Sequence, residues 1–167
     1  TVATAPALLD LKGDFPGLAG DWAYLDTAAT SQKPQAVIDA IARVYGPDYA
    51  TVHRGVYERS ATMTLRFEEA RATVARFIGA ASPDEVVFVR GATEGINMVA
   101  YGWAMPRMQA GDEIILSIME HHANIVPWHF LRERQGVVIK WVEVDSAGAL
   151  DSVKVLEAIT PRTRLIA

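Results

Sequence analysis

The stretch EVVFVRGATEG, residues 85–95, passes from an apolar, β-branched run through a glycine turn into a segment of helical character. Two further runs of the same kind follow, EIILSI at 113–118 and VVIKWVEV at 137–144. Helical patterns alternate with these runs, and we expect helices at 93–104, 124–135 and 152–158. Because the connections are short and contain glycine, this alternation predicts a mostly parallel sheet with right-handed crossovers and helices on both faces, that is, a three-layer α/β fold.

The chain before this stretch has a different character. Amphipathic patterns predict helices at 34–45 and 62–78, with a loop at 46–60 between them. Within 24–30 we expect a short strand that runs into a turn of small residues. We therefore divide the chain into an N-terminal arm with a first strand (1–30), a helical segment with a candidate active-site loop (31–80) and the βα units of a larger domain (81–167).

The last residues, TRLIA at 163–167, look like the opening of a fourth buried strand. A natural domain rarely ends inside a core strand, and the first residue is Thr rather than Met. We therefore expect the α/β domain to be incomplete, truncated at its C-terminus, and the chain to be a piece of a longer protein.

The composition is that of one soluble globular domain. Of 167 residues, 50% are hydrophobic and 22% charged, and 16 basic against 20 acidic side chains give a formal net charge of -4. This balance offers no basic face for nucleic acid or an anionic membrane, and no apolar run approaches the roughly 18 residues of a membrane span. We expect a cytoplasmic protein with neither partner. The absence of Cys excludes a disulfide, a thiolate metal site and a Cys nucleophile within these residues.

The glycine corner at 90–95 is the first candidate site. Free backbone N–H groups at a helix N-terminus, the helix dipole and the hydroxyl of Thr93 can together bind a phosphate group. The structural alternative is that Thr93 caps the helix and Gly91 supplies the turn between strand and helix. The motif is neither a P-loop nor a Gly-x-Gly-x-x-Gly, so both interpretations stay open.

The second candidate is MEHHAN, residues 119–124, at the end of a predicted strand. In a parallel sheet this is the same edge as that of Thr93, and ligands bind there. Two adjacent histidines, His121 and His122, suggest a metal, but adjacent side chains diverge and no ligand spacing accompanies them, so we predict no metal site. Two interpretations remain: a helix entrance capped by Asn124 or a neighbour with His122 hydrogen-bonded in the core, or one imidazole stacked on an aromatic ligand.

The third candidate is TVHRG, residues 51–55, in the long loop. His53 can titrate near neutrality and Arg54 can pair with a carboxylate, which suits an amino or keto acid. Taken alone, these residues are better explained by a solvated loop or a subunit contact.

Four linked motifs, in this order and spacing, resemble the N-terminal part of the Suf-type (group II) cysteine desulfurases: YLDTAATSQKP (24–34), YATVHRGVYERSA (49–61), VVFVRGATEGINMVA (86–100) and GDEIILSIMEHHANIVPW (111–128). These are pyridoxal-phosphate (PLP) enzymes of fold type I, in the class V aminotransferase group, close to selenocysteine lyases. The resemblance implies that this chain is the N-terminal portion of the PLP-binding large domain of such a transferase. The family chain is more than twice as long.

By this resemblance, Thr93 binds the cofactor phosphate together with Ala92. Many relatives have Thr where this chain has Ala92, so Ala92 can contribute only its backbone. His121 matches the histidine that stacks on the pyridine ring and moves protons, which implies both a cofactor-binding and a catalytic role. His53 matches a histidine near the substrate pocket and is implied to bind substrate.

The resemblance also implies the reaction of the intact protein: PLP-dependent conversion of L-cysteine to L-alanine and an enzyme-bound persulfide for iron–sulfur cluster assembly. A homodimer and a sulfur-acceptor protein are implied partners. The Lys that holds the cofactor and the nucleophilic Cys lie downstream of Ala167 in the family, so this chain alone should not turn over. The alternatives are a selenocysteine lyase or other class V enzyme, acting for example on L-selenocysteine, and a non-catalytic α/β module that binds a phosphorylated ligand.

Overall fold

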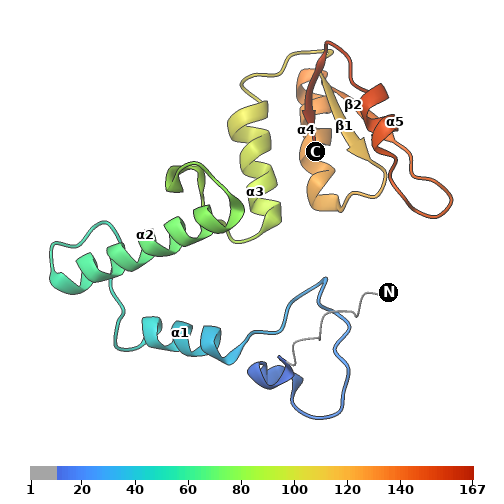
Figure 1. Cartoon of the computed structure of the whole chain (residues 1–167). Coiled ribbons are helices and arrows are strands. Elements are labelled where there is room, and N and C mark those ends of the chain that lie inside the picture. Colours follow the sequence, from blue (N-terminus) through green and yellow to red (C-terminus); the bar gives the residue numbers. More distant parts are fainter. Residues whose placement is uncertain (1–10) are drawn as a thin grey trace, which may run out of the picture. The chain divides into compact units, whose positions relative to one another are not determined.

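The computed structural model describes residues 11–167, which form two compact units that divide between Val86 and Val87. The first unit is built of helices and loops, and the second contains a sheet (Figure 1). No helix in the described residues has the length and hydrophobicity needed to cross a bilayer.

The first unit contains two long helices. Its elements are η1 (Lys12–Asp14), η2 (Pro16–Leu18), α1 (Gln35–Tyr45), α2 (Glu58–Ile78) and η3 (Pro83–Glu85). The sequence predicted both helices, although α2 begins at Glu58 rather than at residue 62. The intervening loop is correspondingly shorter than expected.

The apolar stripes of these helices are largely exposed within residues 11–167. The stripe expected on α1 is present, but its side chains are 40% to 76% exposed: Val37, Ile38, Ile41, Val44 and Tyr45. The buried residues of α2 are Ser60, Met63 and Ala75. The first unit therefore has a much smaller core than the periodicity of its helices suggests.

Two expected strands do not form. In the segment 24–30 the expected turn is present at residues 27–29, but residues 24–26 before it form no strand, and the Tyr24 hydroxyl donates a hydrogen bond to the Thr30 carbonyl. The run at 85–89 is extended at Val86 but is not part of the sheet. An extended segment becomes a strand only when a second one forms a hydrogen-bonded ladder with it, and the ladders of the described chain join only the three strands of the second unit.

The second unit is the expected parallel α/β arrangement. β1 (Glu113–Ser117) lies between β2 (Val138–Val142) and β3 (Thr163–Ile166), and both pairs are parallel. α4 (Val126–Gln135) connects β1 to β2, and α5 (Ser152–Glu157) connects β2 back across to β3. Because right-handed crossovers that run in opposite directions put their helices on opposite faces, α4 and α5 cover different sides of the strands (Figure 1). The predicted fold class is confirmed.

The core of the second unit lies between β1, α4 and the helix that precedes β1. That helix begins as α3 (Ala92–Met98) and continues as a π-helical segment, η4 (Val99–Ala104). The buried cluster consists of Ala100, Ala104, Met108, Ile114, Leu116, Trp128, Leu131 and Val137. On the opposite face of β1, Ile115 is 1% exposed. A strand that is apolar and buried on both faces is typical of a parallel sheet covered by helices.

The run at 163–167 does form a strand, but not a buried one. Along β3 the side chains alternate between intermediate and exposed, and Ile166 is 51% exposed. In the described chain β3 is thus a half-covered edge strand, because its only neighbour there is β1.

Glu113 connects three segments at the start of β1. Its Oε2 accepts hydrogen bonds from Thr160 Oγ1 (2.6 Å), Thr163 Oγ1 (3.2 Å) and Lys140 Nζ (3.4 Å). These bonds, above all that from Thr160, hold the pKa of Glu113 below its ordinary value.

We expect Glu113→Gln to lower the melting temperature at neutral pH. Since folding depresses the pKa of Glu113, its ionised form stabilises the protein above the unfolded-state pKa, and this contribution is lost as the pH falls through the folded-state pKa. Thermal unfolding over a pH series should therefore show a difference from wild type that is largest at neutral pH and disappears in acid. Glu143→Gln, at an exposed position after β2, is the control. A difference independent of pH would contradict the role of the charge.

Candidate functional site

The first motif forms the corner that leads into α3. Ala92 is the first residue of the helix and Gly91 its N-cap, and no side chain caps the helix. Glu94 instead closes the corner, because its carboxylate accepts hydrogen bonds from Arg90 N (2.6 Å) and Arg90 Nη2 (3.1 Å). These bonds from Arg90 hold the pKa of Glu94 below its ordinary value. The corner is therefore fixed without the help of Thr93.

Thr93 is not a helix cap, so the structural alternative for it is wrong. Its backbone carbonyl accepts a hydrogen bond from Asn97 Nδ2 (2.8 Å), whereas its hydroxyl has no hydrogen-bond partner within residues 11–167. The first N–H groups of a helix also lack intrahelical acceptors. Beside them the space is open: a Cβ added at Gly91 would meet no atom within 4 Å. The N–H groups of Ala92 and Thr93 and the Thr93 hydroxyl are thus donors available to a ligand.

The second motif forms the loop between β1 and α4. The loop contains η5 (His122–Asn124), and α4 begins at Val126, so Asn124 does not cap it as one alternative expected. His121 caps η5 instead, since its Nδ1 accepts a hydrogen bond from Ala123 N at 3.1 Å. A neutral imidazole whose Nδ1 is an acceptor carries its proton on Nε2. The atom of His121 that can donate outward is therefore Nε2.

A chain of hydrogen bonds holds this loop between strand and helix. Ser117 Oγ donates to Glu120 Oε1 (2.6 Å), Asn124 Nδ2 donates to Glu120 Oε2 (2.9 Å), and Trp128 Nε1 donates to Asn124 Oδ1 (3.0 Å). The bonds from Ser117 and Asn124 hold the pKa of Glu120 below its ordinary value. Sequence reasoning missed Glu120, although a carboxylate directly before two histidines at a strand end was the available signal.

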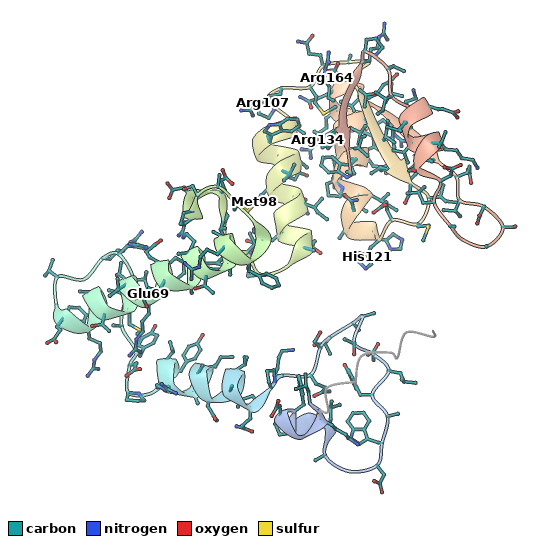
Figure 2. All side chains as sticks on the ribbon, viewed as in Figure 1. Glu69, Met98, Arg107, His121, Arg134 and Arg164 are labelled. Atoms are coloured by element: carbon teal, nitrogen blue, oxygen red, sulfur yellow. The ribbon has the colours of Figure 1, made fainter. Side chains whose placement is uncertain are left out.

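The corner and the loop share a pocket of about 320 Å³. α3 contacts η5, and Figure 2 shows His121 on the loop before α4. The lining residues are Thr93, Asn97, His121, His122, Ala123, Val126 and Pro127. The structure therefore brings Thr93 and His121 to one site, as predicted, although the run before Thr93 is not a strand of the sheet. Their roles toward a ligand stay predictions.

His122 and His129, the other histidines of the second unit, do not gather with His121 into a metal site. His122 is exposed, which contradicts the interpretation of a hydrogen-bonded core histidine, and its ring meets that of His121 edge-on at 6.1 Å. His129 packs against Trp141 with ring centroids 6.2 Å apart. Among the residues that the structure describes, no three His, Cys, Asp or Glu side chains gather as possible metal ligands.

The third motif lies in the first unit, where α2 holds it. His53 has a left-handed backbone, with φ of 63°, which is unusual for a residue other than glycine. Its N–H donates to Thr64 Oγ1 (2.9 Å) and its Nε2 lies 2.9 Å from Glu68 Oε1. His53 and Glu68 line a pocket of about 510 Å³ on this unit. His53 is thus hydrogen-bonded and ion-paired to α2, but its side chain is 52% exposed, so the solvated-loop alternative stays open and its contact with substrate stays a prediction.

We expect Gly55→Ala to displace this loop from α2. Ser60, which is 0% exposed, accepts a hydrogen bond from Gly55 N (3.1 Å) and donates one to the Thr51 carbonyl (2.8 Å). A Cβ at Gly55 would lie 2.5 Å from Ser60 Cβ, so either loop or helix has to move. Overpacking of this kind costs about 1–3 kcal/mol, measurable as a lower midpoint of urea unfolding. Gly13→Ala, whose Cβ would meet no atom within 4 Å, is the matched control, and equal midpoints for the two variants would contradict the close approach.

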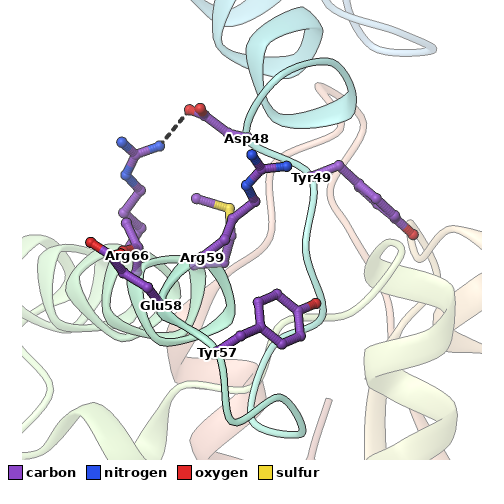
Figure 3. Close-up of a pocket in the computed structure, with 8 residues that line it drawn as sticks. Asp48, Tyr49, Tyr57, Glu58, Arg59 and Arg66 are labelled. Atoms are coloured by element: carbon purple, nitrogen blue, oxygen red, sulfur yellow. Dashed lines mark hydrogen bonds and ion pairs between the residues drawn. The ribbon is translucent and has the colours of Figure 1, made fainter.

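A larger cavity of about 660 Å³ opens in the first unit at the start of α2 (Figure 3). Its lining residues are Asp48, Tyr49, Tyr57, Glu58, Arg59, Thr62, Met63 and Arg66. Arg66 Nη1 pairs with Asp48 Oδ2 at 2.7 Å. The charges of two arginines and two carboxylates cancel in this cavity, and no histidine of the described chain lines it. We therefore place the candidate site in the smaller pocket, which combines phosphate donors with a histidine.

Comparison with known proteins shows the family to which the chain belongs. The profile of the aminotransferase class-V family matches residues 23–167. A cysteine desulfurase from Cronobacter sakazakii is 46% identical over 166 residues, which cover 96% of this chain and 41% of that protein. The apo structure of a cysteine desulfurase from Thermococcus onnurineus NA1 matches with a TM-score of 0.86 at 34% identity, covering 94% of this chain and 38% of that one. The cysteine desulfurase CsdA from Escherichia coli, in an S-sulfonic acid form, matches with a TM-score of 0.75 at 36% identity, covering 93% and 39%.

This chain thus spans about two fifths of the length of these three relatives. The family match nevertheless includes all three candidate motifs and the whole parallel sheet of the second unit. It leaves out only the first 22 residues of the sequence. On the strength of that match, the chain belongs to the aminotransferase class-V family.

Proposed function

We propose that the protein to which this chain belongs is a PLP-dependent cysteine desulfurase of the Suf type. It converts L-cysteine to L-alanine and leaves the sulfur as an enzyme-bound persulfide that serves iron–sulfur cluster assembly. The observation that carries this proposal is the pocket in which the unpaired hydroxyl of Thr93 and the imidazole of His121 meet. Relatives named cysteine desulfurase at 46% and 34% identity support the reaction class, and the four linked motifs support the Suf type.

The donors in this pocket fit a phosphorylated aromatic cofactor. A phosphate group needs several N–H or O–H donors, and Ala92 and Thr93 provide two backbone N–H groups and one hydroxyl at the positive end of α3. Ala92 has no side-chain donor, so it contributes only its backbone. An aromatic ring needs a planar partner, which the His121 imidazole supplies. We assign these three residues to PLP.

His121 has two tasks in this proposal. PLP, when bound, supplies an electron sink for carbanion chemistry. The imidazole of His121 orients the cofactor by stacking, and it holds a transferable proton at Nε2 because Ala123 N–H occupies Nδ1. Imidazole exchanges protons readily at neutral pH, which suits the proton movements of this reaction. Val126 and Pro127 give the pocket an apolar wall.

Other parts of the proposed machinery lie elsewhere. His53 is proposed to contact the amino-acid substrate, L-cysteine or L-selenocysteine. The Lys that anchors PLP and the Cys that takes the sulfur are expected outside these 167 residues, which contain no Cys. We further propose that the whole protein is a cytoplasmic homodimer that passes its sulfur to an acceptor protein.

Turnover by the full-length protein tests the proposal. We expect the purified protein to retain PLP, seen in its visible absorbance, and to release alanine and sulfide in equal amounts from L-cysteine in the presence of a reductant. Alanine release from L-selenocysteine alone would favour a selenocysteine lyase. Binding of PLP or phosphate without any alanine would favour a non-catalytic module. A protein that neither binds PLP nor forms alanine would overturn the proposal.

A further inference from the structure

We infer that Glu120 is a positioning residue that fixes the orientation of His121 through its hydrogen bonds to Ser117 and Asn124. The inference rests on the proposed function, since it concerns the residue proposed to act on the cofactor. Glu120 does not line the pocket that His121 and Thr93 share, so it acts through its neighbour rather than on a ligand.

The hydrogen bonds around Glu120 can run in only one direction. An indole N–H donates and never accepts, so Trp128 Nε1 requires an acceptor, which is Asn124 Oδ1 at 3.0 Å. The amide nitrogen of Asn124 must then face Glu120, where it needs an acceptor in turn. Glu120 accepts this bond with one oxygen and the Ser117 hydroxyl with the other. An ionised carboxylate can accept both hydrogen bonds and has no donor that would need a partner.

Both ends of this chain are anchored in rigid parts of the fold. Ser117 is the last residue of β1 and is 8% exposed, while Trp128 belongs to α4 and is 2% exposed in the core. Glu120 therefore connects the central strand to the following helix across the loop. Its lowered pKa, which follows from the bonds from Ser117 and Asn124, keeps the carboxylate ionised at neutral pH.

His121 lies between Glu120 and Asn124, the two residues that this hydrogen-bond network holds in place. Glu120 precedes it, and Asn124 N donates to the His121 carbonyl at 2.7 Å. The ring is held in turn by Ala123 N, which donates to Nδ1 at 3.1 Å. When Glu120 or Asn124 is displaced, the turn that carries the Ala123 N–H moves too, and the imidazole is free to rotate and to exchange tautomers. We therefore expect the network to keep the proton of the His121 ring on Nε2.

A swapped pair of substitutions tests the direction of the network. Asn124→Asp sets two carboxylates against each other, because Trp128 still claims one oxygen at position 124. In the double variant Glu120→Gln/Asn124→Asp, the glutamine amide nitrogen donates to the new carboxylate and its carbonyl oxygen accepts from Ser117, so every partner is satisfied again. We expect Asn124→Asp and Glu120→Ala to disturb His121 and the double variant to restore it.

The first readout uses the cofactor-free full-length protein. Ring ¹⁵N shifts of His121 report its tautomer, and the indole ¹H–¹⁵N signal of Trp128 reports the far end of the network. We expect Asn124→Asp and Glu120→Ala to lose the Nε2–H preference and to shift the indole signal, and the double variant to recover both. Glu133→Gln, an exposed acid on α4, is the control. If His121 keeps its wild-type tautomer in both disruptive variants, the inference is overturned.

The second readout is turnover of L-cysteine by the holoenzyme. We expect each disruptive variant to lower kcat by about tenfold or more with little change in KM, and the double variant to return to within about threefold of wild type. Wild-type kcat in Asn124→Asp, or a double variant that regains the His121 tautomer without regaining kcat, would refute positioning through His121. If the wild type has no desulfurase activity while the tautomer responds as expected, the proposed function fails and the role of Glu120 toward His121 stands.

Discussion

His121→Ala in the full-length holoenzyme is expected to lower kcat for L-cysteine by about 10²–10⁴-fold, the usual contribution of a positioned acid–base group, while KM changes little. The reason lies in the geometry of the loop. Nδ1 is committed to Ala123 N, so Nε2 is the atom of this side chain that can exchange a proton over the pocket. Its proton matters in the transition state more than in substrate binding. Steady-state formation of alanine measures both constants.

A second histidine of the same unit provides the control. His129→Ala also removes an imidazole, but that ring packs against Trp141 and does not line the pocket. We expect its effect to appear in the melting temperature rather than in kcat. A His121→Ala variant with wild-type kcat would refute the catalytic role, and equal losses of kcat in both variants would show that the pocket senses any disturbance of α4.

The strands and helices of the second unit could be predicted because the apolar pattern within each segment indicates which of its faces are buried. The run at 113–118 is apolar on both faces, and the structure buries Ile114 and Ile115 on opposite sides of β1. The run at 85–89 has the same apolar character but forms no part of the sheet. Periodicity reports that a segment is suited to be a strand, whereas a strand also needs a neighbour, and the neighbour is not encoded in the segment itself.

The residues of the candidate site also fall into those that the sequence could predict and those that it could not. Thr93 and His121 were predicted as neighbours from the carboxyl edge of a parallel sheet. The run before Thr93 is not in that sheet, and the contact between α3 and η5 brings the two residues together instead. The position of Glu120 directly before two histidines was a signal, but its role could not be predicted, because that role depends on the direction of hydrogen bonds that begin at the indole of Trp128. The left-handed backbone of His53, whose N–H donates to Thr64 on α2, was equally hidden in the sequence.

Thr93→Val is expected to weaken PLP binding by about 1–3 kcal/mol, or about 5- to 150-fold in Kd, because a hydroxyl that donates to a phosphate is lost. Valine keeps the shape and β-branching of threonine, so the substitution removes little else. The structure sharpens this expectation: within the described part of the chain the Thr93 hydroxyl neither caps α3 nor bonds to any other group, so its loss should leave the melting temperature of the cofactor-free protein unchanged. Equilibrium dialysis of PLP against the cofactor-free full-length protein measures the affinity, and Thr93→Ser, which keeps the hydroxyl, should retain it. Unchanged affinity in Thr93→Val would refute the phosphate assignment, whereas a fall in both affinity and melting temperature would indicate that Thr93 stabilises the corner itself.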